Sequence, residues 1–419
     1  MTKTYTFPKR FLWGAATSAH QVEGGMHNQW SISELEHART RAKQAEYKLD
    51  YLPDWDDIKR DATRPSNYVS GAAVDHYNRY EEDFDLLTRM HMNAFRFSIE
   101  WSRIEPEEGK WDEKQIEHYR QYLGALKKRS IEPVVSLFHW SMPVWFAEKG
   151  GFERRANINY FVRFAEKVLQ EFEPHIRLVC TFNEPEVYIG QGWMNEGDWP
   201  PHKQRQYIQG ARTYANLATA HNRVARAGRA ISRRFKFSVS KNCAHHFAGD
   251  DSYKTKIAVA SWRYIYDYWF LNRIRRNMDW LGLNYYFSNR YIAGKIENEN
   301  KIVNDLAWEM RPSDIQFVLE RLYKKYRLPI IITENGVADR YDRYRKWWIA
   351  HTLDAIHTAM KNGVKIEGYL HWSLLDNFEW AYGKWPRFGL AEIDYASQTR
   401  TLRPSAKWFG AVIKKMRQL

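Results

Sequence analysis

The chain has 419 residues, of which 44% are hydrophobic and 16% aromatic, and its formal net charge is +14. No stretch approaches the roughly 18 uncharged apolar residues of a transmembrane helix, so we expect no membrane span. The positive charge raises the hypothesis of a nucleic-acid partner. However, Lys and Arg are spread along the whole chain, and we interpret groups such as Arg223, Arg226 and Arg229 as solvated helix faces.

The N-terminus and the cysteines give expectations about location and cofactors. Residues 1–10 run into a strand-like segment without a long apolar stretch, so we predict no signal peptide and a cytoplasmic protein. Cys180 and Cys243 lie in or beside predicted core strands, where a free thiol acts as a small hydrophobic group. No group of residues has the spacing of metal ligands, so we expect no metal and no other cofactor.

Eight short apolar runs that end in polar or aromatic residues predict strands. In chain order they cover residues 12–17, 94–98, 133–138, 178–182, 237–242, 280–284, 329–333 and 368–373. Helical periodicity fills the intervals, as in residues 77–87 and 160–172. This alternation favours a single (β/α)8 TIM barrel, with residues 1–419 forming one catalytic domain. The alternative, an open doubly wound sheet, lacks a glycine-rich phosphate-binding turn.

Residues 31–70 separate the first two predicted strands by far more than one helix needs. This segment is charged and contains Pro53 and Pro65. We predict a long first loop with short helices, lying over the mouth of the barrel.

Two glutamates occupy equivalent places at the ends of buried strands. Glu184 closely follows the apolar run 178–182, and Glu334 follows the run 329–333. Either alone reads as a loop carboxylate that makes a cap or an ion pair. Two carboxyl groups that face each other across one cavity are what glycoside hydrolysis requires, so the pair favours catalysis. The 19 Trp residues also suggest a ligand with flat faces, as sugars have.

Other polar and aromatic residues gather at the same strand ends, which is where barrel enzymes build active sites. Taken singly, His139 reads as a buried core histidine and Arg96 as a structural ion pair. Together with their neighbours they predict one site at the mouth of the barrel. The candidates are Gln21, Arg96, His139, Asn183, Asn284, Tyr286, Trp372, Glu379 and Trp380.

Several segments resemble glycoside hydrolase family one, in the same order and from end to end of the chain. They are residues 11–24, 95–103, 138–140, 181–185, 281–286, 332–336, 371–380, 387–390 and 403–406. The resemblance implies a retaining β-glycosidase that releases the terminal non-reducing β-D-glycosyl residue of oligosaccharides or aryl and alkyl glycosides. Glucose is the first choice of sugar, with galactose or fucose as alternatives. It implies Glu184 as acid/base and Glu334 as nucleophile, with carboxyl groups about 5–5.5 Å apart.

The same resemblance gives roles to the other candidates. Arg96 and the Tyr286 hydroxyl would keep Glu334 charged. Glu379 suits free O4 and O6 hydroxyls and would repel a 6-phosphate, which disfavours a phospho-β-glucosidase. A glutamate at position 184, rather than a glutamine, disfavours a thioglucosidase. The residues expected to bind the sugar are Gln21, His139, Asn183, Asn284, Tyr286, Trp372, Glu379 and Trp380.

An aromatic platform for the leaving group is also implied. Trp308 resembles that platform, and Trp140, Trp193 and Trp199 could extend it, although ordinary packing explains the last two equally well.

The sequence departs from the family pattern at three places. His20 stands where a tyrosine is commoner, and Ser141-Met142 replaces an aspartate-leucine pair, which bears on leaving-group preference. The stretch between Asn272 and Asp279 is far shorter than usual. A helix-to-strand connection lies on the stability face of a barrel, so we expect the loss to spare catalysis.

Two other classes of function compete with hydrolysis. A sugar-binding barrel that has lost hydrolysis would lack one carboxylate, and neither is missing. A nucleic-acid binder would be retained on heparin in a strongly salt-dependent way. We expect a small carbohydrate as partner, with no nucleic acid and no membrane, and the sequence leaves the oligomeric state open.

Overall fold

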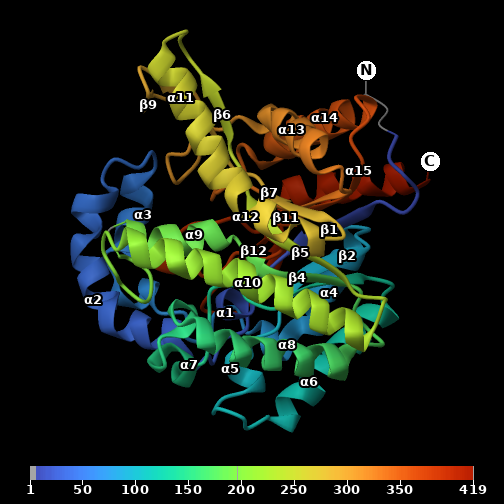
Figure 1. Ribbon diagram of the computed structural model, residues 1–419. Coiled ribbons are helices and arrows are strands. Elements are labelled where there is room, and N and C mark those ends of the chain that lie inside the picture. The colour runs from blue at the N-terminus through green and yellow to red at the C-terminus, as the bar shows by residue number, and fades with distance from the viewer. Residues whose placement is uncertain (1–5, 196, 419) are drawn as a thin grey trace.

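The computed structural model describes residues 6–195 and 197–418 and shows a closed barrel of eight parallel strands (Figure 1). The strands are β1 (Leu12–Ala16), β2 (Ala94–Ser98), β3 (Glu132–Ser136), β4 (Leu178–Asn183), β5 (Lys236–Asn242), β7 (Leu281–Asn284), β10 (Ile330–Asn335) and β11 (Ile366–Trp372). Around the barrel they follow the order β1-β11-β10-β7-β5-β4-β3-β2. The predicted (β/α)8 barrel is confirmed, and the open doubly wound sheet is excluded.

The predicted strand boundaries agree with the structure to within two residues. Strands β4 and β10 extend beyond their predicted ends, and the two extensions have the same physical cause. Asn183 and Glu334, expected just after their strands, still pair with neighbouring strands, but only after a register shift in each ladder. A bulge of this kind re-aims a side chain without ending the strand.

Helices follow the strands and cover the outside of the barrel. The longer ones are α4 (His76–Arg89), α6 (Glu113–Lys128), α8 (Ile158–Phe172), α10 (Tyr207–Ile231), α13 (Ile315–Tyr326), α14 (Arg345–Lys361) and α15 (Pro404–Gln418). In α8, Phe161, Phe164 and Val168 recur at steps of three and four and are buried against the barrel. Asp112 caps α6 by accepting hydrogen bonds from two backbone N–H groups of its first turn.

Shorter elements lie in the connections that follow the barrel strands. The short helices are α1 (Ala19–Val22), α5 (Trp101–Ile104), α7 (Val144–Glu148), α9 (Pro185–Ile189), α11 (Tyr253–Trp262) and α12 (Trp269–Ile274), with π-turns η4 (Gly190–Met194) and η5 (Arg263–Tyr268). A two-stranded sheet pairs β12 (Ala391–Asp394) with β13 (Thr399–Leu402). A three-stranded sheet of β6 (His245–Ala248), β8 (Ser288–Ile292) and β9 (Lys295–Ile296) projects with α11 from the barrel (Figure 1).

The segment 31–70 differs from the prediction of short helices. Its first part belongs to a single helix of 21 residues, α2 (Gln29–Leu49), which α3 (Trp55–Ala62) follows. Asn28 and Ser31 form a reciprocal capping box at its start. The buried stripe of α2 consists largely of alanines, such as Ala38 and Ala42, so its hydrophobic periodicity is weak in the sequence. Figure 1 shows these two helices in blue at the left of the molecule.

Arg229 of α10, which we interpreted as part of a solvated helix face, contacts the short connection before β7. Arg229 of α10 donates to the Asp279 carboxylate at 3.0 Å and to the Asn277 carbonyl at 3.1 Å. The side chain is about one-third exposed, so the interpretation of Arg229 as merely solvated is wrong. The contact ties α10 to the start of β7, at the end of the short connection between Asn272 and Asp279.

Two expectations about the chain as a whole concern cysteines and membranes. Cys180 and Cys243 are buried free thiols, as predicted. In the described part of the chain, no helix is long and apolar enough to cross a membrane. The N-terminal segment on which the signal-peptide prediction rests begins with residues 1–5, which lie outside the described residues.

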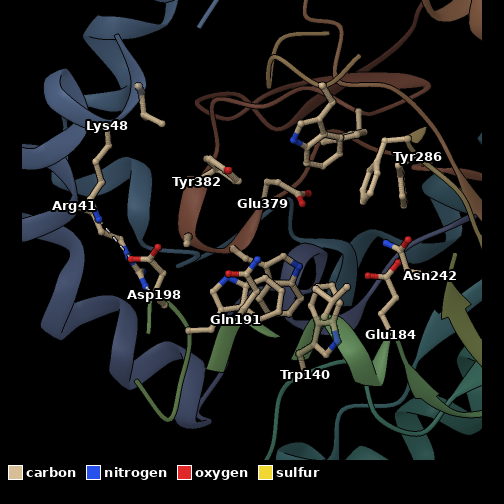
Figure 2. Close-up of a pocket in the computed structure, with 18 of the residues that line it drawn as sticks. Arg41, Lys48, Trp140, Glu184, Gln191, Asp198, Asn242, Tyr286, Glu379 and Tyr382 are labelled. Carbon is tan, nitrogen blue, oxygen red and sulfur yellow. Dashed lines mark hydrogen bonds and ion pairs between the residues drawn. The ribbon is translucent and has the colours of Figure 1, made fainter. Parts of the chain in front are cut away.

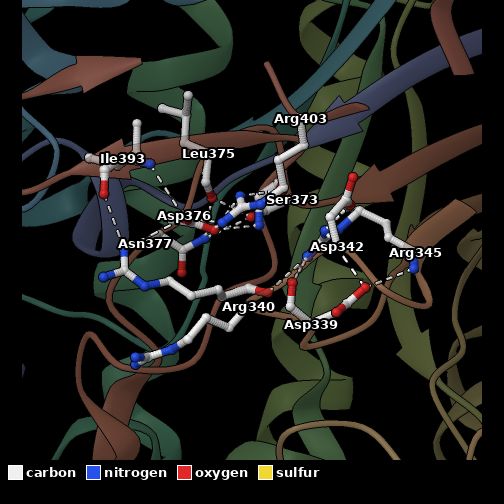
Figure 3. A network of polar contacts seen from close by, with 12 residues as sticks. Asp339, Arg340, Asp342, Arg345, Ser373, Leu375, Asp376, Asn377, Ile393 and Arg403 are labelled. Atoms are coloured by element: carbon white, nitrogen blue, oxygen red, sulfur yellow. Dashed lines mark hydrogen bonds and ion pairs between the residues drawn. The ribbon is translucent and has the colours of Figure 1, made fainter. Parts of the chain in front are cut away.

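A buried ionic network holds the segment that follows β11 (Figure 3). Arg403 donates to both oxygens of Asp376, at 3.0 and 2.9 Å, and Asp376 has no solvent exposure. Burial alone would raise the pKa of Asp376, but Arg403 and Arg387 outweigh it and lower the pKa below its usual value. This stabilisation is therefore present above about pH 4 and lost as the pH falls further.

Replacing Asp376 by asparagine keeps the side chain's size but leaves two arginines without their counter-charge. Breaking a buried ion pair costs about 3–5 kcal/mol, so we expect the free energy of unfolding in urea to fall by about that amount. Glu367→Gln is the matched control, because Glu367 forms an exposed pair with Lys365. It should change stability by less than about 0.5 kcal/mol. Equal losses in both variants would contradict a stabilising role for the Asp376 network.

Candidate active site

A cavity of about 470 Å³ opens at the carboxyl ends of the barrel strands (Figure 2). Figure 2 shows Glu184 and Tyr286 on one side, Arg41 and Lys48 of α2 on the other, and Glu379 between them. The predicted residues that line the cavity are His139, Trp140, Glu184, Trp199, Tyr286, Trp308, Glu334, Trp372, Glu379 and Trp380. The strand-end pattern therefore identified one cavity.

Four predicted residues lie behind the cavity wall rather than in it. Arg96, Gln21, Asn183 and Asn284 have no solvent exposure, and none of them belongs to the lining residues. Each hydrogen-bonds to a side chain that does line the cavity. They orient the side chains that line the cavity, and direct sugar contact by Gln21, Asn183 and Asn284 stays a prediction.

Glu334 projects from β10 and is held by two donors. An Arg96 guanidinium nitrogen donates to Oε1, and the Tyr286 hydroxyl donates to Oε2 at 2.7 Å. Tyr286 follows the neighbouring strand β7, whereas Arg96 lies on β2, further round the barrel, and Glu334 is only 4% exposed. A carboxylate with both oxygens occupied in this way has a fixed orientation.

Glu184 lies directly after β4 in a different environment. Its backbone has φ +39°, in the left-handed region that non-glycine residues rarely adopt. Asn284 donates to its Oε1 at 2.8 Å. Burial, and then the negative charge of Glu334, raise the pKa of Glu184 well above its usual value. Two glutamates in one cavity thus have separate tasks open to them, a proton donor at Glu184 and an anion at Glu334.

Asn183 connects these carboxylates to a histidine. Its Oδ1 accepts from Arg96 at 2.7 Å and from Asn284 at 3.1 Å, which fixes its amide nitrogen toward His139 Nε2 at 3.0 Å. The proton of the neutral ring must then be on Nδ1 of His139. Burial lowers the pKa of His139 well below its usual value, so the ring is neutral. Nδ1 has no partner among the described residues and is a donor for a ligand hydroxyl.

Glu379 is the third carboxyl group in the cavity. Burial, and then repulsion by Glu334, raise the pKa of Glu379 to about 8. In the unliganded protein at neutral pH it is therefore mostly protonated, which differs from the charged group assumed in the sequence reading. Gln21 donates to the Phe378 carbonyl at 2.8 Å and to the Asn377 side chain at 3.1 Å. These bonds hold the segment that carries Glu379.

Aromatic rings form the floor and one wall of the cavity. His20 stacks on Trp380 with ring centroids 5.4 Å apart, and its Nε2 lies 2.6 Å from Glu34 of α2. The unusual His20 thus ties α2 to the floor. Trp140 and Trp199 line the cavity together, with centroids 4.5 Å apart.

Trp193 does not take part in the platform. It is 2% exposed, does not line the cavity, and donates its indole N–H to Glu153 at 3.0 Å. For this residue the extension of the platform is wrong, because its ring fills space between helices.

Sequence reasoning missed several lining residues. Asn242 closes the predicted strand 237–242 and could have been found by the strand-end rule. The strand-end rule could not find the lining residues of α2, because this helix was not predicted. These residues are Arg41, Gln44 and Lys48. Among the described residues, no three His, Cys, Asp or Glu side chains are arranged to hold a metal ion.

The chain is similar to known proteins along almost its whole length. The profile of glycosyl hydrolase family 1 matches residues 3–276 and 270–418, and these segments meet at the shortened connection before β7. Beta-glucosidase A of Thermotoga maritima is 27% identical over 97% of this chain and 98% of its own. Beta-glucosidase 42 of Arabidopsis thaliana is 29% identical over 99% of this chain and 95% of its own.

Solved structures agree with this similarity. A beta-glycosidase from Pyrococcus horikoshii superposes with a TM-score of 0.86 at 31% identity, covering 99% of this chain and 96% of that one. The beta-glucosidase from Thermotoga maritima in complex with castanospermine has a TM-score of 0.86 at 26% identity, with 99% of each chain covered. The chain belongs to glycosyl hydrolase family 1 and is an O-glycoside hydrolase.

Proposed function

We propose that the protein is a retaining β-glycosidase that removes the terminal non-reducing β-D-glycosyl residue, glucose first, by double displacement. Galactose and fucose are the alternative sugars, and the substrates are oligosaccharides or aryl and alkyl glycosides. The observation that carries the proposal is the unequal pair of buried glutamates in one cavity. Glu184 has a strongly raised pKa, whereas Glu334 is bound by Arg96 and Tyr286.

In the first step the Glu334 carboxylate attacks the anomeric carbon while the bond to the leaving oxygen breaks. Glu184 transfers its proton to that oxygen, so the leaving group departs as a neutral alcohol. The product is a glycosyl ester of Glu334 with inverted configuration. Arg96 and Tyr286 hold the carboxylate oxygens in place for this attack.

In the second step Glu184, now ionised, removes a proton from water. The water attacks the anomeric carbon from the face the leaving group occupied, and Glu334 departs as a carboxylate. Two inversions give overall retention. The same cavity therefore needs one group that alternates between acid and base, and the raised pKa of Glu184 suits that task at neutral pH.

Sugar recognition involves His139 and Glu379. The Nδ1–H of His139 is a donor without a partner among the described residues, and Glu379 with its pKa of about 8 can donate or accept. We expect them to bind hydroxyls of the terminal sugar, with Trp380 as the stacking surface. A 6-phosphate would still be disfavoured, because its negative charge would be buried near Glu334, and Glu379, with a pKa of about 8, offers no counter-charge. A sugar-binding barrel without hydrolysis is not favoured.

Azide rescue separates the two carboxylates. With a 2,4-dinitrophenyl β-glucoside, whose leaving group needs no acid, Glu184→Ala should form the glycosyl-enzyme and then stall. Azide should restart turnover and give the β-glucosyl azide. Glu334→Ala should be inactive toward every leaving group, and azide should give the α-glucosyl azide. The same anomer from both variants by NMR would rule out these assignments.

The role of Glu379 can be tested by Glu379→Ser. Sugar hydroxyls that donate to Glu379 favour its charged form. Each hydrogen bond to a charged group is worth about 1.5–3 kcal/mol, so kcat/KM for 4-nitrophenyl β-glucoside should fall roughly 10- to 150-fold per lost bond. A 6-phosphorylated glucoside should lose far less. Glu392 is exposed on β12, so Glu392→Ser serves as the matched control and should behave as wild type. Equal losses on both substrates would mean that Glu379 does not contact the sugar.

Tyr286→Phe removes one of the two donors to Glu334. The bond is charge-assisted, so we expect kcat/KM for β-glucosides to fall roughly 10- to 150-fold, and the loss should persist with the dinitrophenyl substrate. Tyr326→Phe is the control, because its hydroxyl donates to Asn272 outside the cavity. Wild-type activity in Tyr286→Phe would show that the hydroxyl does not support the nucleophile.

A further inference from the structure

A lysine is buried in strand β5 next to the cavity. Lys241 has no solvent exposure, and the four residues before it in β5, Phe237 to Ser240, are small or apolar. Its Nζ lies 2.9 Å from Oε2 of Glu186, itself 8% exposed. The ammonium group also lies 4.8 Å from the centre of the Tyr266 ring, and Tyr266 lines the cavity. No step of the mechanism above uses this ion pair.

The pair joins the segment of the acid/base to strand β5. Glu186 stands two residues after Glu184, in α9. The Glu184 backbone N–H donates to the Ser240 carbonyl at 2.8 Å, immediately before Lys241. Glu186 Oε1 accepts from the Asn242 N–H at 2.8 Å, and Lys241 Nζ donates to the Asn242 carbonyl at 2.9 Å. Three consecutive residues of β5 are thus bonded to the segment that begins with Glu184.

A buried ion pair contributes little net free energy to the stability of a fold. Two charges removed from water recover their solvation only in part, and apolar residues of similar volume often serve equally well. Ionised groups buried beside a catalytic acid instead alter the electrostatic potential at that acid. Because the Glu186–Lys241 pair is buried close to Glu184, we expect it to influence whether Glu184 is charged.

Several charged or titratable groups face Glu184 from the surrounding elements. Those that act on it directly are Glu334 of β10, Arg96 of β2, Glu186 of α9, Tyr266 of η5 and Tyr286 after β7. Lys241 of β5 lies behind Glu186, and His139 after β3 lines the same cavity. Burial keeps the pKa of both tyrosines well above the usual value, and His139 is neutral. The groups that carry charge are therefore Glu334, Arg96, Glu186 and Lys241.

Glu186 acts on Glu184 in a definite direction. After burial and Glu334, the negative charge of Glu186 is the next influence that raises the pKa of Glu184. Burial also raises the pKa of Glu186 itself, and Lys241 is the largest opposing influence. The carboxylate of Glu186 therefore depends on Lys241 for its charge.

We propose that Glu186 and Lys241 form a positioning pair that keeps the acid/base Glu184 protonated in the resting enzyme. Lys241 holds Glu186 as an anion, and that anion disfavours a second negative charge on Glu184. The inference rests on the proposed role of Glu184 as general acid. The two residues act through Glu184 and need not touch the substrate.

The proposal predicts the pH at which kcat/KM falls on the alkaline side of its profile. This alkaline limb reports loss of the Glu184 proton. Glu186→Gln removes the anion but leaves the Lys241 cation, so the limb should move down by about one pH unit. The double variant Glu186→Gln/Lys241→Met removes both charges, and its limb should lie between the other two. The order from high to low pH is then wild type, double variant, Glu186→Gln.

The test is a pH profile of kcat/KM with 4-nitrophenyl β-glucoside for all three proteins. One pH unit above the wild-type limb, and with each profile normalised to its own plateau, Glu186→Gln should be roughly tenfold slower than wild type. With the 2,4-dinitrophenyl β-glucoside, which leaves without a proton, the variants should show no such shift. This second substrate separates a change in Glu184 from general damage to the fold.

The outcomes are distinct. Three coincident alkaline limbs in active enzymes would overturn the inference and leave the pair a structural element. An equal shift with the dinitrophenyl substrate would also overturn it, because the effect would not pass through the acid. Wild-type enzyme without activity on either substrate would refute the proposed function instead. If Glu186→Gln does not fold, the double variant, which leaves no unpaired charge, still decides by comparison with wild type.

Discussion

A guanidinium without solvent exposure inside a barrel must find both counter-charge and hydrogen-bond acceptors, because an unpaired buried charge is very costly. Arg96 meets this requirement by donating one nitrogen to Glu334 and another to Asn183. It thereby links the ends of β10 and β4, the two strands that present the carboxyl groups. Asn183 in turn hydrogen-bonds to His139 and accepts from Asn284, and Asn284 also donates to Glu184. The orientations of these five side chains around Arg96 are therefore linked through that one buried cation.

Electrostatic asymmetry follows from the same arrangement. Arg96 lies against Glu334, while Glu184 receives only an amide donor and faces the Glu334 charge. Both glutamates are buried, but Arg96 donates a hydrogen bond to Glu334 and none to Glu184. A proton is therefore held more firmly on Glu184 than its usual pKa would allow, which is the condition for an acid and a nucleophile to coexist in one cavity.

Much of this could be predicted from the sequence, because strand ends are local features. The apolar runs that end at Asn183 and Glu334 are short and bounded by polar residues, so their boundaries are clear. Helix α2 could not be recognised, since its buried face is mostly alanine and the segment reads as charged. The Lys241–Glu186 pair joins residues 55 positions apart and depends on register between β4 and β5, which no local pattern encodes. The raised pKa of Glu379 likewise arises from burial among residues distant in sequence.

The central claim is that Glu334 forms the covalent bond to the sugar, and trapping the intermediate tests it most directly. A 2,4-dinitrophenyl 2-deoxy-2-fluoro-β-glucoside slows the second step more than the first, so the glycosyl-enzyme should accumulate. Proteolysis and tandem mass spectrometry should then locate one fluoroglucosyl group on the peptide that contains residues 330–335, at Glu334. A label on Glu184, or complete turnover with inverted product and no label, would contradict the account.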